Sequence, residues 1–399
     1  MRDNEPLSTA DVPPVVQPPR KQRIESLDML RGLVMIIMAL DHTRDFFSNA
    51  HFQPTDLSKT NAALFLTRLV THFCAPTFIL LAGIGAFLYG NKRGCRKDLS
   101  WYLFSRGVWL ILLEFTLVNV GWSFDLSFQG VVGQVIWAIG ASMVVLAGLV
   151  WLPLPVILAF GLLLIVGHNA LDGVQPQSLG IWATAWKILH TGGAIEYLPG
   201  HKFFAFYPLV PWMGVMAVGY ALGPVYLWTP ERRRNILIKL GVGLLLAFVL
   251  VRWLNVYGDP HPWKVQSSPL FTLFSFVNCN KYPPSLCYLL MTLGPACLAL
   301  ALLERAQGKL ASIAITFGRV PLFYYLLHVP LIHGLAVLFV IVQYGKSASL
   351  FSPGDPPPGY PLPIVYLVWL AVVAALYLPC RWFAGVKARN RDKEWLSYL

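Results

Sequence analysis

The residues most able to do chemistry are gathered in one apolar stretch near the start of the chain. This stretch, SLDMLRGLVMIIMALDHTRDFF, begins at Ser26 and carries ionisable side chains toward both ends. These side chains are Asp28, Arg31, Asp41, His42, Arg44 and Asp45. Ionisable groups are costly in a segment that crosses a membrane, so each is a candidate for function or for a buried ion pair. The imidazole of His42 beside the carboxylate of Asp41 suits general acid–base catalysis, and His51 follows soon after.

Arg31 and His42 are expected to lie on one face of a helix. They are eleven residues apart, which at about 100° per residue is three turns plus about 20°, and the helical rise separates them by roughly 16 Å. Such a face suits a long thioester cofactor, with its phosphates held by Arg31 and its acyl group carried to a general base. This cofactor site is a hypothesis.

Two other interpretations of the same residues are open. Asp28 and Arg31 are three residues apart and could form a local ion pair, and the charged residues around Asp41 could form a second one. A metal site is the other alternative, because the segment from Asp41 to His51 contains ligand types. However, neither H-E-x-x-H nor a comparable spacing occurs, and the six cysteines show no zinc spacing. We therefore expect no metal.

Polar side chains in later apolar stretches could complete a site. Arg68 and His72 are one turn apart on a helix and face together. Arg319, in the segment GRVPLFYYLLH, is placed where it could contact a cofactor phosphate at the inner face. The candidates for binding a substrate are Arg44, Asp45, Arg68, His72 and His328.

The elements that must position these residues are membrane-spanning helices. Of 399 residues, 56% are hydrophobic and only 13% are charged, and the mean hydropathy is +0.58, a balance that a water-soluble protein would struggle to cover with polar surface. A spanning helix needs about 20 mostly apolar residues. Ten such stretches lie near 29–47, 62–89, 101–120, 131–151, 154–170, 206–227, 236–254, 284–303, 316–342 and 361–380. The sequence therefore predicts an all-α, polytopic integral membrane protein of about ten transmembrane helices.

The basic residues predict its orientation. Lys and Arg cluster before the first stretch and in even-numbered connections such as 92–97 and 232–234, whereas odd-numbered connections carry isolated lysines. By the positive-inside rule, both termini are predicted to be cytoplasmic, in the inner (cell) membrane. The same distribution accounts for the net charge of +12 without a nucleic-acid partner. We expect a disordered cytoplasmic tail over 1–22, a membrane domain over 23–383 and a basic cytoplasmic tail over 384–399.

The chain also resembles a known family over nearly its whole length. The opening R-I-x-S-L-D-x-L-R-G-L, from Arg23 to Leu33, and the later M-A-L-D-H-T-R-D-F-F resemble the transmembrane acyltransferase superfamily. Together with THFCAPTF, YPLVPWMGVMAVGY, KYPPSLCYLLMTLGP and FGRVPLFYYLLH, they are similar to a bacterial membrane-protein family related to the heparan-alpha-glucosaminide N-acetyltransferase catalytic domain. The similarity to the eukaryotic enzyme is looser and is concentrated in the first two spans.

The resemblance implies transfer of an acetyl group from cytosolic acetyl-CoA to an acceptor on the far side, with a histidine near the outer end of the first helix as the acting group. His51 aligns close to the catalytic histidine of the eukaryotic enzyme, whereas His42 matches that of the distantly similar sugar O-acyltransferases, which also have an arginine eleven residues earlier. We favour His42, because the helical-face argument selects it independently, and keep His51 as second choice. Asp41 stands where the eukaryotic enzyme has asparagine, which leaves the proton-transfer scheme open.

The leading hypothesis is thus a membrane-embedded acyltransferase whose partners are acyl-CoA, the lipid bilayer and a sugar, glycolipid or small-amine acceptor. The attack on the thioester is either direct or through an acyl-histidine. A proton-coupled transporter or flippase is the main rival, because intramembrane His, Asp and Arg also form proton relays. It predicts proton-coupled flux and no need for CoA. A non-catalytic assembly or sensor protein is the third hypothesis, and it predicts that each histidine can be replaced singly. Homodimers are the commonest symmetric assemblies, so a homodimer is the oligomer to test.

Overall fold

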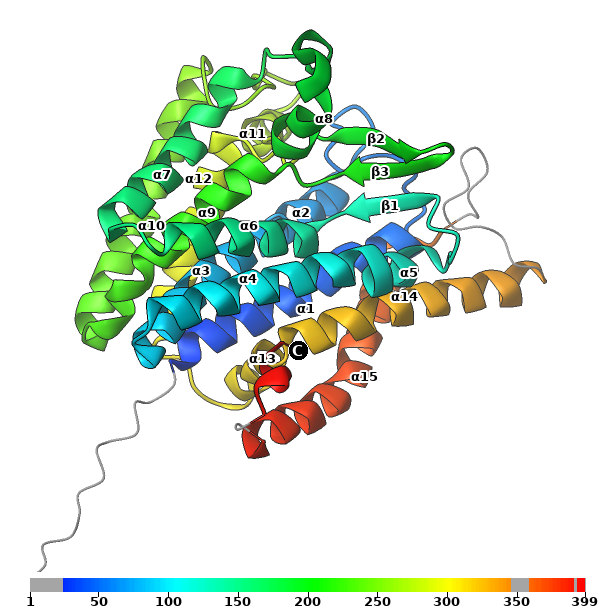
Figure 1. Cartoon of the computed structure of the whole chain (residues 1–399). Coiled ribbons are helices and arrows are strands. Elements are labelled where there is room, and N and C mark those ends of the chain that lie inside the picture. The colour runs from blue at the N-terminus through cyan, green and yellow to red at the C-terminus, as the bar shows by residue number, and fades with distance from the viewer. Residues whose placement is uncertain (1–23, 346–358, 391–392, 399) are drawn as a thin grey trace, which may run out of the picture.

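A computed structural model describes residues 24–345, 359–390 and 393–398 as a bundle of helices with a small sheet at one end (Figure 1). The predicted tail over 1–22 lies outside the described residues. The α-helices are α1 (Glu25–Phe47), α2 (Ala62–Thr71), α3 (Cys74–Arg93), α4 (Arg96–Leu113), α5 (Asn119–Ser123), α6 (Val135–Leu149), α7 (Leu154–Gly167), α8 (Ala183–Trp186), α9 (Leu209–Leu222), α10 (Pro230–Leu254), α11 (Pro269–Val277), α12 (Leu286–Leu303), α13 (Lys309–Arg319), α14 (Pro321–Tyr344) and α15 (Leu362–Arg389). The 3₁₀ helices are η3 (His168–Leu171), η4 (Pro176–Trp182), η6 (Gly223–Leu227) and η7 (Glu394–Tyr398), and the π-helices are η2 (Glu114–Val118) and η5 (Lys187–Thr191).

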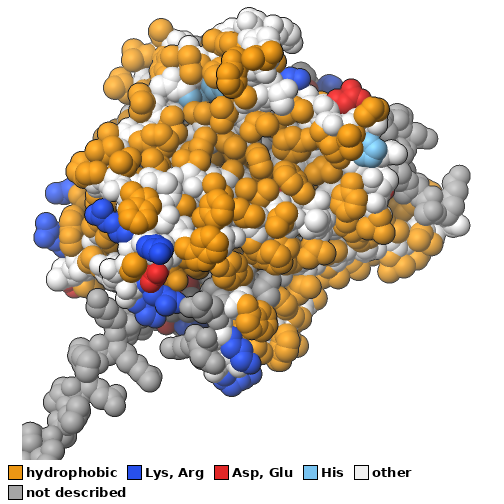
Figure 2. Space-filling model, viewed as in Figure 1, with side chains coloured by type: hydrophobic (Ala, Val, Ile, Leu, Met, Phe, Trp, Pro, Cys, Tyr) orange, Lys and Arg blue, Asp and Glu red, His pale blue; other side chains and the backbone are white. Residues whose placement is uncertain are grey.

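The prediction of an all-α polytopic membrane protein is confirmed. Within the described residues, eight helical segments are long and apolar enough to cross a membrane. The other two predicted stretches are also helical but do not count among the eight, because α6 has only 15 residues and α1 carries several ionisable side chains. Figure 2 shows hydrophobic side chains over most of one face, with Lys and Arg gathered at the end where the described chain begins.

Helix α1 lies inside the bundle, which explains how it can carry so many charges. It packs against α2, α3, α12, α13, α14 and α15, so most of its side chains are buried by protein. The closest crossing is with α13, where a Cβ added to Gly32 would lie 1.7 Å from the carbonyl oxygen of Ala314, and one added to Gly318 would lie 1.7 Å from that of Asp28. Only glycine permits two helices to approach this closely.

Two predicted spans are broken where the sequence allows it. The stretch 62–89 consists of α2 and α3, which meet at His72 and Phe73. The stretch 316–342 contains the end of α13 and the start of α14, because Pro321 cannot continue a helix from the preceding residue but is well placed in a first turn. The break places Arg319 at the end of α13 rather than inside a span.

A three-stranded sheet was not predicted. Its order is β1 (Gly130–Gly133), β3 (His201–Ala205), β2 (Gly193–Leu198), with β1 parallel and β2 antiparallel to β3. The predicted span over 131–151 is wrong at its start, because Val131 and Val132 pair with β3 and the helix begins only at Val135. An apolar valine pair is as compatible with a strand as with a helix.

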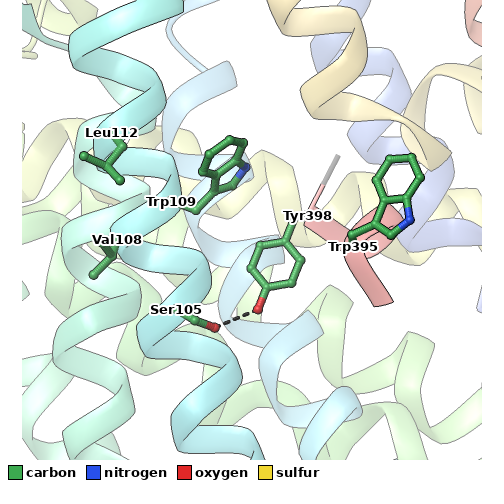
Figure 3. A pocket seen from close by; sticks show the side chains of 6 residues that line it. All are labelled: Ser105, Val108, Trp109, Leu112, Trp395 and Tyr398. Carbon is green, nitrogen blue, oxygen red and sulfur yellow. Dashed lines mark hydrogen bonds between the residues drawn. The ribbon is translucent and has the colours of Figure 1, made fainter. Parts of the chain in front are cut away.

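The C-terminal end returns to the bundle. Helix α15 continues to Arg389, and η7 packs against α4 through a hydrogen bond of 2.7 Å between Ser105 Oγ and the Tyr398 hydroxyl. Between these elements lies a cavity of about 640 Å³ (Figure 3), lined by Ser105, Val108, Trp109, Leu112, Trp395 and Tyr398. This lining is almost entirely apolar and includes none of the residues that the sequence nominated for chemistry.

Candidate functional site

The carboxylate of Asp41 is the centre of a buried polar cluster where α1 and α2 meet. Its Oδ1 lies 2.6 Å from Arg44 Nη1 and accepts a hydrogen bond of 2.8 Å from the Thr71 hydroxyl. Its Oδ2 forms an ion pair with Arg68, one turn before Thr71 on α2. Arg44 also donates to Asp45 Oδ1 at 2.6 Å. The structure therefore joins Arg68 to the first helix, and the local pairing predicted around Asp41 is present as well.

His42 does not use Asp41 as its partner. Its Nδ1 lies 2.7 Å from Nε2 of His328, which comes from α14 and is separated from it by 286 residues. The two rings stack with centroids 4.9 Å apart, and the His328 side chain is fully buried. The sequence predicted His328 only as a substrate-binding candidate, so its direct contact with His42 was not predicted.

The hydrogen bonds of His328 fix which nitrogen of His42 is available for chemistry. His328 Nδ1 lies 2.8 Å from the carbonyl oxygen of Tyr325 and 3.1 Å from that of Tyr324. Carbonyl oxygens only accept, so Nδ1 of His328 carries the proton and its Nε2 accepts. His42 Nδ1 must then be the donor, which leaves the lone pair of His42 on Nε2. Within the described residues Nε2 has no hydrogen-bond partner. This nitrogen is the candidate general base.

Two aromatic side chains flank the His42 imidazole. The Trp122 ring, on α5, packs edge-on against it with centroids 4.8 Å apart. The Tyr325 ring, on α14, is also edge-on at 6.2 Å. Both residues lie far from α1 in sequence, and neither was predicted. They come close because α5 packs against α14, and α14 in turn packs against α1.

Lys281 and Tyr282 reach the Asp41 cluster from the connection between α11 and α12. Lys281 is 8% exposed, and its charge acts on Asp41. Three cations (Arg44, Arg68, Lys281) therefore face two carboxylates in one largely buried cluster. Burial opposes ionisation of the Tyr282 phenol, but the nearby charges of Lys281 and Arg68 outweigh burial and hold its pKa below the usual value.

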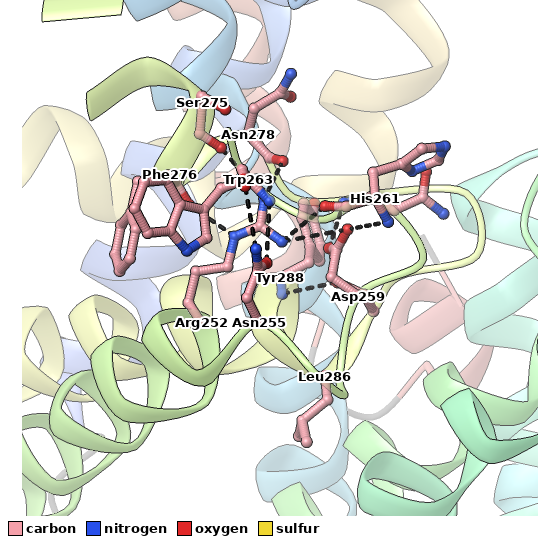
Figure 4. A network of polar contacts seen from close by, with 12 residues as sticks. Arg252, Asn255, Asp259, His261, Trp263, Ser275, Phe276, Asn278, Leu286 and Tyr288 are labelled. Carbon is pink, nitrogen blue, oxygen red and sulfur yellow. Dashed lines mark hydrogen bonds and ion pairs between the residues drawn. The ribbon is translucent and has the colours of Figure 1, made fainter. Parts of the chain in front are cut away.

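A buried arginine fixes the connection that carries Lys281 (Figure 4). Its guanidinium binds four carbonyl groups: Arg252 donates to the carbonyls of Ser275 and Phe276 in α11, of Asn278 in the connection after α11, and of His261 in the connection before it. Asp259 lies 3.5 Å from Arg252 and accepts hydrogen bonds from the Asn280 amide at 2.9 Å and the Ser285 hydroxyl at 2.6 Å. Because these bonds lie on both sides of Lys281, they restrict where its side chain can go.

The two predicted cofactor-binding arginines lie together at the other end of α1. Arg31 donates from Nη1 to Asp28 Oδ1 at 3.1 Å and to the carbonyl oxygen of Gly318 at 3.2 Å. Arg319, which follows Gly318, has a side chain that is 42% exposed, and its Nη2 lies 3.8 Å from Glu25 Oε1. Arg31 therefore does form the predicted local pair. Because it also binds the carbonyl of Gly318, the residue before Arg319, the crossing of α1 and α13 places both arginines at the same end of the bundle.

The other two nominated histidines, His51 and His72, make no described contact with His42. His51 is exposed in the connection after α1, and its ring makes no hydrogen bond to another described residue. His72 is buried after the end of α2, where its carbonyl accepts from the Tyr288 hydroxyl at 2.7 Å. Within the described residues, no group of three or more His, Cys, Asp or Glu side chains is arranged to hold a metal ion.

Sequence reasoning missed four residues around His42 and Asp41. They are Thr71, Trp122, Lys281 and Tyr325. Lys281 and Tyr325 do lie in KYPPS and GRVPLFYYLLH, two segments singled out from the sequence. No spacing rule connects either segment to α1, however, because the contacts depend on the packing of distant helices.

Comparison with known proteins supplies one match. A family model described as heparan-alpha-glucosaminide N-acetyltransferase, catalytic, matches residues 23–258, more than half of the chain. No curated protein matches significantly. The matched region runs from α1 beyond the end of α10 and contains His42, Asp41 and Arg68. It ends before Lys281 and His328, so the contacts made by these two residues are evidence that only the structure supplies.

Proposed function

Because the chain belongs to the family of the heparan-alpha-glucosaminide N-acetyltransferase catalytic domain, we propose that it is a membrane-embedded acyltransferase that moves an acetyl group from cytosolic acetyl-CoA to an acceptor at the outer face. The observation that carries this proposal is the His42–His328 hydrogen bond, since it leaves His42 Nε2 as a free base in a buried site. The acceptor is a sugar, glycolipid or small amine.

His42 acts as general base in this scheme. Its Nε2 takes the proton from the acceptor amine or hydroxyl as that group attacks the thioester carbonyl carbon. The new C–N or C–O bond forms, the C–S bond breaks, and the CoA thiolate leaves and receives the proton. His328 holds the imidazole of His42 in the tautomer that this step requires.

Arg31 and Arg319 bind the donor at the opposite end of α1. Guanidinium groups make strong charge-assisted hydrogen bonds to phosphate, and the eleven-residue separation of Arg31 from His42 spans roughly 16 Å. The basic end of the bundle faces the cytoplasm by the positive-inside rule, so CoA enters there and the acetyl group is carried toward the outer end. The inner membrane is the expected location.

The first experiment compares acetyl-CoA binding and CoA release in wild type, His42→Ala and His51→Ala, with amino sugars, glycolipids and small amines as acceptors. We expect His42→Ala to bind acetyl-CoA with nearly unchanged affinity and to lose about 10²–10⁴-fold in turnover, since general base catalysis contributes that much. His51→Ala should transfer normally because its ring is exposed and makes no hydrogen bond to a described residue.

The matched control is His168→Ala, which removes a buried imidazole that contacts neither His42 nor His328. The Nδ1 of His168 lies 3.0 Å from the carbonyl oxygen of Leu164 in α7, so this variant should lower thermal stability without abolishing turnover. Full activity of His42→Ala, or loss of activity only in His51→Ala, would overturn the assignment of the base. Failure of the folded wild-type protein to bind acetyl-CoA would contradict the acyltransferase and favour proton-coupled transport.

A further inference from the structure

Two buried donors next to His42, the Trp122 indole and the Tyr325 hydroxyl, make no regular hydrogen bond to any residue that the structure describes. Both atoms, the indole Nε1 and the hydroxyl oxygen, are shielded from solvent. Tyr325 as a whole residue is only 3% exposed. Buried polar groups are almost always hydrogen-bonded. Buried donors without a partner among the described residues also occur at Trp137 and Tyr226, so it is the position of this pair beside His42 that marks it as a candidate binding site.

Their placement relates them to one reacting centre. The two side chains come from different helices, α5 and α14, yet both rings pack edge-on against His42, at 4.8 Å for Trp122 and 6.2 Å for Tyr325. The Tyr325 hydroxyl and the Trp122 indole are also close enough to interact with each other. The two donors and the catalytic imidazole therefore share one small region of the bundle.

The chemistry of the pair is that of an oxyanion-binding site. An indole N–H can only donate, and a phenol can donate, so together they offer two hydrogen bonds to a single oxygen atom. We propose that Trp122 and Tyr325 bind the carbonyl oxygen of the donor thioester and stabilise the oxyanion that forms on it. This inference rests on the proposed acyltransferase function and assigns these two side chains as catalytic residues within it.

The acceptor attacks the carbonyl carbon and loses its proton to His42, while the C=O π electrons move to the oxygen, which takes up the negative charge. Trp122 Nε1–H and Tyr325 O–H donate to that oxygen. When the C=O bond re-forms, the C–S bond breaks, the thiolate leaves, and the proton passes from His42 to sulfur.

The carboxyl group of Glu114 is near enough to act on Tyr325, and its Oε1 also makes no hydrogen bond to a described residue. Its Oε2 accepts a hydrogen bond of 2.8 Å from the Trp137 amide at the N-terminus of α6, which ties the α4–η2 segment to α6. Glu114 begins the π-helix η2, and α5 with Trp122 follows directly. A π-helix shifts the register of the residues after it and is frequent at functional sites. Here the π-helical turn leads into the segment that packs Trp122 against His42.

The test removes each donor while keeping its ring, with Trp122→Phe and Tyr325→Phe. The controls, Trp137→Phe and Tyr226→Phe, remove buried donors that also lack a partner within the described residues and that contact neither His42 nor His328. We expect each site variant to lose about 10²-fold or more in the turnover of acetyl-CoA, as loss of one oxyanion donor typically does. Its Kd for acetyl-CoA should stay within about threefold of wild type, and the controls should keep wild-type turnover.

A spectroscopic readout separates this role from a structural one. The infrared band of acetyl-CoA labelled with ¹³C at the carbonyl should shift to lower frequency on binding, and this shift should shrink in both site variants. An unchanged shift and wild-type turnover in both variants would overturn the oxyanion assignment and leave the acyltransferase intact. Failure of the wild-type protein to bind or turn over acetyl-CoA would instead remove the proposed function itself.

Discussion

At the scale of single residues, the proposed mechanism gives His42 and His328 different roles. His42 lies on α1, where its spacing from Arg31 could be recognised in the sequence, whereas His328 supplies the hydrogen bond that orients it. The sequence suggested Asp41 as the carboxylate that orients His42. In the structure this carboxylate instead binds Arg44, Arg68 and Thr71. Removing one partner of such a buried ion pair typically costs about 3–5 kcal/mol, so Asp41 stabilises the site whether or not it moves a proton.

The orienting role of His328 predicts an ordering of variants. His328→Phe keeps a ring stacked beside Tyr324 but removes the acceptor for His42 Nδ1, so kcat should fall by about 10–10²-fold, less than for His42→Ala. His328→Gln retains a side-chain oxygen that can accept, and it should recover part of the activity. KM for acetyl-CoA should change little in either variant. Steady-state kinetics measures this ordering, and equal activity of the two variants would contradict it.

At the scale of the helices, local patterns predicted the elements but not which of them meet. The apolar stretches identified the helical regions, and the 3.6-residue period placed Arg31 and His42 on one helix, because both are properties of contiguous sequence. The pairing of α1 with α14 and the arrival of Lys281 from a connection held by Arg252 depend on long-range packing. The β1 strand was missed because a valine pair fits either period.

The crossing of α1 and α13 should tolerate no side chain. In Gly32→Ala the new methyl group would meet the carbonyl of Ala314, and such overpacking typically costs about 1–3 kcal/mol. The same displacement would move Arg31 away from Gly318, so affinity for acetyl-CoA should also fall. Thermal unfolding in detergent and acetyl-CoA titration measure the two effects.

Gly85→Ala on α3 is the matched control for that crossing. A Cβ at Gly85 meets no atom within 4 Å, so alanine there should be neutral or should stabilise the helix by up to about 1 kcal/mol through its better helix propensity. Equal melting temperatures for the Gly32 and Gly85 variants would show that the two helices are free to separate, and the close approach would then have no role in the stability of the bundle.

At the scale of the whole molecule, the composition indicates a membrane protein, and the distribution of basic residues predicts its orientation. The hydrophobic face in Figure 2 and the basic residues at the end where the described chain begins agree with the sequence prediction of a membrane protein. The proposed mechanism depends on this orientation, because it has acetyl-CoA enter at the end that carries Arg31 and Arg319. If that end faced outward, a cytosolic donor could not reach it.

One native cysteine makes this orientation measurable. All six cysteines are free, and only Cys95, in the connection between α3 and α4, is exposed, whereas the others are buried. A membrane-impermeant maleimide should therefore leave intact cells unlabelled and should label Cys95 in inside-out vesicles. Cys95→Ala should abolish the signal, and Leu126→Cys in that background should restore labelling from the outside, because Leu126 is exposed in the connection after α5. Labelling of Cys95 in intact cells would reverse the topology and exclude a cytosolic acetyl donor at Arg31.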